Sequence, residues 1–194
     1  SFLHGHLFGD NVHEYLAPCI YEGEGGMLGM AFFKSLVKEH GKKYFEPIGK
    51  ALAAAGIKKP NPMNPAHAWA LKGALAPYAS WYMSQKLRVG GSHSLPEIPA
   101  KLRDHADWAC DTLQSQPLNI SGVMRKHQLK LADRQCRMSH LSGQLQKMII
   151  VLATSLFASQ KNDEVVQTAA DVICDDLRRE ITGKPPSDRY FRKV

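Results

Sequence analysis

The sequence predicts an all-α fold, an antiparallel helical bundle, from three observations. Apolar residues recur at intervals of three and four along most of the chain, as they do on the buried face of a helix. Glycine and proline fall in clusters that separate these runs. No stretch alternates apolar and polar residues as a half-buried strand does. With 194 residues, 44% of them hydrophobic, the chain can bury a substantial core.

Three helices are predicted in the first half of the chain, after a glycine-rich lead. Gly41 should close the first of them, because glycine readily takes the left-handed backbone at a helix end. Asn64 and Pro65 should begin the third as its N-cap and first residue. Pro77 lies inside that third helix and should kink it. The predicted ranges are 26–40, 43–55 and 65–89.

The second half is predicted to hold three longer helices and a short final turn at 187–191. Pro96 and Pro99 should open the first, which we expect to end near Ser115. Asn162 or Asp163 should cap the last, and Gly183 should close it. Between these two, we expect one long helix that begins at Asn119 or Ser121 and reaches Ser159.

The long helix would carry two features. Its apolar residues form a near-heptad seam, the pattern of helices that pack against one another. Its basic residues Lys126, Lys130, Arg134 and Arg137 are spaced to lie on one face, which suits either a patch for acidic lipid or CoA phosphates or an ordinary solvated surface. The seam consists of Met124, Leu131, Met138, Leu141, Leu145, Met148 and Leu152.

Charge, cysteine content and hydropathy limit the partners and the cellular location that the chain can have. The formal net charge of +7 permits nucleic acid or an anionic membrane as partner, but no zinc-finger or other nucleic-acid signature accompanies it, so we expect no nucleic-acid partner. The four cysteines are widely spaced, which predicts reduced thiols and a cytoplasmic protein. The longest uncharged apolar run, 148–159, is shorter than the roughly 20 residues that span a bilayer. The first residues resemble no signal peptide, and we expect a fragment of a longer protein.

The tripeptide Tyr21-Glu22-Gly23 is the strongest candidate for chemistry. It places a carboxylate between an aromatic residue and a glycine just before a helix. A carboxylate that is buried and aimed can act as a general base, because burial raises its pKa towards the working pH. From spacing alone, the alternative is a surface glutamate beside Glu24.

The chain resembles the carboxy-terminal part of acyl-CoA dehydrogenases. In that family a glycine-rich GGxGF turn precedes a YEGT(N/S)(E/Q)I motif and a helix. The corresponding residues here are His4–Gly9, Tyr21–Met27 and Met27–Phe33. Later segments, Lys126–Leu129 and Ala132–Arg134, are similar to the extra helical domain of the very-long-chain type. The resemblance therefore implies two parts, a catalytic segment with its helices at 1–90 and an additional helical domain at 91–194.

The resemblance implies a role for specific residues. Glu22 would be the base that removes the alpha proton of a fatty acyl-CoA, while FAD accepts the beta hydride and passes electrons to an electron-transfer flavoprotein. Gly5 and Gly23 would be backbone positions near the flavin. The product would be a trans-2-enoyl-CoA, the step belonging to fatty acid beta-oxidation. By itself this piece should be inactive, and the parent is expected to be a homo-oligomer.

The chain departs from the family pattern beside the motif. Glu24, Gly25 and Gly26 replace side chains that hold the adenosine part of FAD in the family. His4 and His6 replace neighbours of the glycine-rich turn and could hydrogen-bond a phosphate instead. An acyl-CoA oxidase, which shares fold and base, remains an alternative. So does a non-enzymatic module for oligomerisation or peripheral membrane docking, which the seam and the basic face would suit.

The remaining clusters of polar and aromatic residues are weaker candidates for a functional site. His4, His6 and His13 lack the companion ligands of a closed site, so no metal is expected. Arg178, Arg179 and Arg189 should pair with nearby carboxylates of Asp175, Asp176 or Asp188. The aromatic residues of the third helix should form core or subunit interface; they are Trp69, Tyr78, Trp81 and Tyr82.

Overall fold

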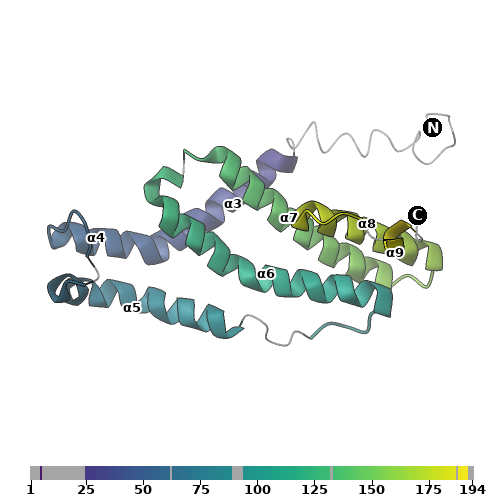
Figure 1. Ribbon diagram of the computed structural model, residues 1–194, viewed down its shortest axis with the longest axis horizontal. Helices are drawn as coiled ribbons and strands as arrows, with labels where there is room; N and C mark the ends of the chain where they lie inside the picture. The colour runs from purple at the N-terminus through teal and green to yellow at the C-terminus, as the bar shows by residue number, and fades with distance from the viewer. Residues whose placement is uncertain are drawn as a thin grey trace.

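The computed structural model describes residue 5 and residues 25–61, 63–88, 94–131, 133–186 and 188–191. Within these residues the fold is all-α, as predicted, with no strand (Figure 1). The elements are α3 (Gly25–His40), η1 (Gly41–Phe45), α4 (Glu46–Ala54), α5 (Pro65–Arg88), α6 (Ala100–His127), η2 (Gln128–Leu131), α7 (Gln135–Ser159), α8 (Glu164–Thr182) and α9 (Asp188–Phe191).

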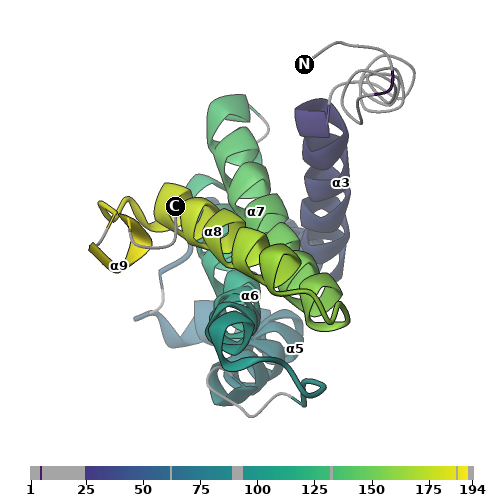
Figure 2. The same cartoon turned by 90° about the vertical axis from the view of Figure 1, so that its right-hand side faces the viewer.

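The helices pack around α7. Helices α6 and α8 both lie against it, and α3 lies along its other side (Figures 1 and 2). Helices α4 and α5 pair with each other at one end of the molecule. The long helices therefore cover one another's apolar faces, and the pocket described below lies between two of them.

One buried cluster joins α3 to the second half of the chain. Phe33 of α3 packs with Met124, Leu131, Met138 and Leu141, which come from α6, η2 and α7. Each of these side chains is at most 9% exposed. The predicted parts 1–90 and 91–194 thus share a core cluster in the described residues, and their division into domains stays a prediction.

Small residues bring α6, α7 and α8 close together. Ala106, Ala158 and Ala170 meet in one cluster, one from each helix. Ala109, Val151 and Cys174 form a second, also one from each helix. Short side chains let helix backbones approach closely and fix their register. The polar side chains between these positions on α6 and α8 are therefore held at defined distances from one another.

The prediction that one helix runs from 119 to 159 is wrong. Helix α6 does not end near Ser115 but continues through Pro117 to His127, and the chain then breaks at η2 before α7 begins. A proline inside a helix costs about 3 kcal/mol. Burial of Ser121 and Met124 beyond it provides packing that offsets this cost. The break falls instead at Arg134, whose backbone is not helical.

The predicted helix end at Gly41 is also wrong. The five-residue π-helix η1 carries the chain from α3 directly into α4. A π-turn accommodates an extra residue and so changes which side chains face inward. Tyr44 of η1 is buried. The second predicted helix, 43–55, is therefore the end of η1 followed by α4.

Other helix ends predicted from local residues are confirmed, at α5 and α8. Asp163 caps α8, accepting hydrogen bonds at Oδ1 from the backbone N–H of Val165 and Val166 at 2.8 and 3.3 Å. Gly183 follows α8 with a φ of +68°, a left-handed conformation that favours glycine. Helix α5 begins at Pro65, and its predicted end near 89 agrees with Arg88.

Candidate functional site

The predicted base and most of the predicted residues near it lie outside the described residues. Glu22 and Gly23 belong to that part of the chain, as do His4, His6 and His13. Gly5 is described and lies exposed in a turn with a φ of +79°. Glycine adopts this conformation without the steric cost that a side chain brings. The glycine-rich turn expected at this position is therefore compatible with the backbone of Gly5.

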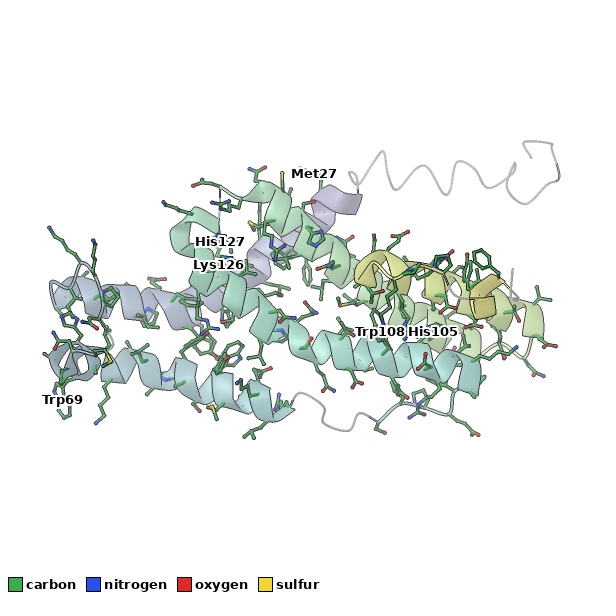
Figure 3. All side chains as sticks on the ribbon, in the orientation of Figure 1. Met27, Trp69, His105, Trp108, Lys126 and His127 are labelled. Carbon is green, nitrogen blue, oxygen red and sulfur yellow. The ribbon has the colours of Figure 1, made fainter. Side chains whose placement is uncertain are left out.

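A pocket of about 680 Å³ lies between α6, α8 and the segment that follows Gly183. Sequence reasoning did not anticipate it. Its floor includes His105 and Trp108 of α6, which lie close together in Figure 3. Both charge signs line it: the carboxylates are Asp104, Asp171 and Asp175, and the cations are Lys101, Arg178, Arg179 and Lys184.

His105 is the most constrained group of this pocket. It is 2% exposed, and its Nε2 lies 2.8 Å from Oδ1 of Asp171, which is itself buried. Its Nδ1 lies 2.8 Å from Nη1 of Arg178. A guanidinium can only donate, so Nδ1 must accept, and the proton of the neutral ring must sit on Nε2 and be donated to Asp171. The two neighbours thus fix one tautomer of His105.

Arg178 extends this chain of contacts back to α6. Its Nη1 lies 2.7 Å from Oδ2 of Asp104, and its guanidinium stacks 4.9 Å from the centroid of the Trp108 ring. The prediction that Arg178 pairs with a carboxylate of its own segment is wrong, because its ion pair is with Asp104 of α6. The contacts Asp171–His105–Arg178–Asp104 therefore cross three times between α8 and α6.

Arg179 also lines the pocket. It pairs with Asp176, as predicted, and lies 3.9 Å from the ring centroid of Tyr190 in α9. Its Nε is buried and has no hydrogen-bond partner among the described residues. The aromatic contact explains how the segment after α8 is held over the pocket.

Three potential metal ligands meet on the floor. One ligand atom each from His105, Asp171 and Asp175 lies within 4.8 Å of the others. Asp171 and Asp175 are one helical turn apart on α8, which places them on the same face. That spacing was visible in the sequence, but the partner on α6 was not, because no local pattern tells which helices pair.

A second polar cluster surrounds Ser121, which is fully buried. Its Oγ lies 2.7 Å from the hydroxyl of Tyr78 and 3.3 Å from Nε2 of His40. The ring of His40 lies 4.6 Å from that of Trp81. Burial, and secondly the charge of Lys43, lowers the pKa of His40. A serine with no exposed surface cannot attack a substrate, so this cluster is structural.

The predicted aromatic cluster is confirmed in part. Tyr78, Trp81 and Tyr82 are half-buried, and Tyr78 contacts both of the other rings. Trp69 does not belong to it: the indole is 76% exposed and lies beside Lys72. An exposed tryptophan on α5 is a surface feature, not part of the core.

The basic residues expected on one helix face are distributed differently. Lys126 ends α6, Lys130 lies in η2, Arg134 in the connection and Arg137 in α7. The prediction of a single helical face is therefore wrong. Three of them still lie near His127, since burial and then the charges of Arg134, Lys126 and Arg137 lower the pKa of His127.

Two further findings bear on the class of protein. Among the described helices, α7 is long and apolar enough to cross a membrane, but core helices meet the same criterion and a third of the apolar stretch is buried here. The described cysteines Cys110, Cys136 and Cys174 are free.

Comparisons with models of protein families, with curated proteins and with solved structures found no match to this chain.

Proposed function

We propose that this chain is the carboxy-terminal helical part of an FAD-dependent acyl-CoA dehydrogenase. The observation that carries the proposal is the motif Tyr21-Glu22-Gly23, placed between a glycine-rich lead and a helix. Two structural facts support it: Gly5 has the left-handed backbone of a glycine turn, and α3 begins at Gly25, directly after the motif. The finer fold assignment, an antiparallel bundle divided at residue 90, belongs to the same proposal.

The proposed chemistry needs one base and an oriented cleft. Glu22 accepts the alpha proton of the acyl-CoA, which the thioester makes acidic. FAD, when bound, supplies the hydride acceptor and passes electrons to an electron-transfer flavoprotein. Gly5 and Gly23, which have no side chains, let the cofactor or substrate approach the backbone closely.

Glu22→Gln in the full natural protein that carries this sequence tests the proposal. Removing a general base typically costs about 10²–10⁴-fold in rate. We expect a fall of this size in acyl-CoA-dependent reduction of an electron acceptor, with FAD content unchanged. The measurement is steady-state kinetics on protein whose flavin is quantified by absorbance.

Glu24→Gln is the matched control, because it removes the same charge two residues away. It should retain wild-type activity within a few-fold. Equal activity of wild type and Glu22→Gln would show that Glu22 is not the base. Peroxide formation without an added acceptor would favour an acyl-CoA oxidase.

A helical module for oligomerisation or membrane docking is the second candidate. The near-heptad seam no longer favours it, because those residues are buried or half-buried within the chain itself. An apolar face on α3 favours this second candidate. On it, Leu28 and Phe32 are 50% and 59% exposed. Met27 and Leu36 extend it. A patch of this kind often marks an interface.

Phe32→Glu is expected to weaken self-association of the chain if α3 forms that interface. A charge in an apolar contact should raise the dissociation constant about tenfold or more, as loss of a central aromatic residue does. Light scattering after size exclusion measures it, with Ser80→Glu, which adds the same charge at an exposed serine of α5, as control. Unchanged association would exclude this face as the interface between copies of the chain. Co-sedimentation with anionic liposomes distinguishes membrane docking from self-association.

A further inference from the structure

We propose that His105, Asp171 and Asp175 bind a divalent transition-metal ion at the floor of the pocket between α6 and α8. This site is independent of the proposed acyl-CoA chemistry. The three side chains offer one imidazole nitrogen and two carboxylate oxygens within 4.8 Å of one another. Such a mixed set suits ions such as Mn²⁺, Fe²⁺ or Zn²⁺.

The distances fit an ion with small adjustments. Nε2 of His105 is 2.8 Å from Oδ1 of Asp171 and 3.8 Å from Oδ1 of Asp175. Ligands about 2.1 Å from a metal lie roughly 3.0–3.4 Å from one another in octahedral or tetrahedral sites. These two separations lie on either side of this range, and the third is at most 4.8 Å, so side-chain shifts of roughly 1 Å would complete the arrangement.

The helices that carry the ligands are packed tightly. Ala106 and Ala109 follow His105 on α6, and both are fully buried. Ala170 and Cys174 flank the carboxylates on α8, and they belong to the same two clusters that join these helices. A site held by packed helices has its ligands placed before the ion arrives, which lowers the cost of binding.

The pocket gives the ion a way in. The side chain of Asp175 is 28% exposed, and all three ligand residues line the pocket of about 680 Å³. Three protein ligands leave coordination positions for water or for a small anion. An open site of this kind suits a labile or catalytic ion more than a purely structural one.

The positive charge of Arg178 lies close to the proposed site and disfavours a bound cation. Binding at Nε2 of His105 requires a lone pair there, so the ring proton must move from Nε2 to Nδ1. Arg178 then can no longer donate to Nδ1 and must withdraw. It retains Asp104, which already lies 2.7 Å away. Loss of its nearby positive charge should therefore strengthen metal binding.

Titration of the chain with Mn²⁺, followed by the EPR signal of the free ion, tests the site. Mn²⁺ prefers carboxylate and imidazole over thiols, which keeps it off the exposed Cys136. We expect saturation at one ion per chain, displaced by Zn²⁺, which generally binds such sites more tightly.

Variants assign the binding to these residues. Asp175→Asn should weaken it about 10-fold or more, as even outer-shell changes do at metal sites. Asp176→Asn removes the same charge from the next residue, whose carboxylate pairs with Arg179, and should leave the affinity within about 2-fold of wild type. Arg178→Gln should bind more tightly than wild type.

The outcomes separate clearly. Circular dichroism is used to check that each variant is folded, and the 28% exposed side chain of Asp175 makes its substitution by asparagine a mild change to the core. Absence of saturable Mn²⁺ binding at millimolar ion would overturn the proposal. Equal weakening by Asp175→Asn and Asp176→Asn would do so as well, because it would indicate a diffuse acidic surface.

Discussion

Replacing Phe33 with alanine is expected to lower the free energy of unfolding by about 3–5 kcal/mol. Phe33 is 1% exposed and is the member of its buried cluster that comes from α3. Truncation removes an aromatic ring from contact with Met124, Met138 and their neighbours, and leaves a cavity that rigid helices fill only in part. Chemical denaturation followed by circular dichroism measures the loss.

Phe32→Ala is the matched control on the adjacent residue. It deletes the same atoms from the same helix, but Phe32 is 59% exposed. Surface substitutions usually change stability by no more than about 0.5 kcal/mol. Similar losses in both variants would mean that α3 is not docked through Phe33. A loss confined to Phe33→Ala would show that α3 docks on the second half of the chain through Phe33.

The helix ends that the sequence predicts correctly are those with a local cause. Asp163 caps α8 with its own side chain, and Gly183 ends the helix through its own backbone. Pro65 needs no partner from elsewhere to start α5. Such signals act within a few residues and can be read without knowing the fold.

The wrong helix ends have a cause outside the segment. Pro117 looks like a helix breaker, yet α6 continues because Ser121 and Met124 are buried against other helices. Gly41 looks like a helix end, yet η1 continues because Tyr44 is buried. Packing of this kind depends on which helices meet, and no local pattern carries that information.

The pocket escaped prediction for the same reason. Arg178 and Asp104 are 74 residues apart, and only the pairing of α6 with α8 brings them to 2.7 Å. Glu22 is the opposite case: it is proposed as a base from its resemblance to a family motif, while Glu22 itself lies outside the described residues. The two candidate sites thus rest on different kinds of observation and are tested separately.

Replacing Asp171 with alanine is expected to cost about 3 kcal/mol of folding free energy in metal-free buffer. Asp171 is 3% exposed and accepts the Nε2 proton of His105. Alanine leaves that donor buried with no acceptor in its place, and the unmet hydrogen bond carries most of the cost. Asp171→Asn keeps an oxygen acceptor, so its loss should be only about 1 kcal/mol. Denaturation with a chelator present measures both.

A double-mutant cycle decides whether the hydrogen bond is the cause. When His105→Leu has already removed the donor, Asp171→Leu leaves no imidazole N–H unpaired, so it should cost at least about 1 kcal/mol less than in the wild type. Arg178 keeps Asp104 and Trp108 in every variant. Equal costs in the two backgrounds would mean that Asp171 stabilises the protein independently of His105. A positive coupling would identify this pair as the buried polar link that fixes how α6 and α8 face each other across the pocket.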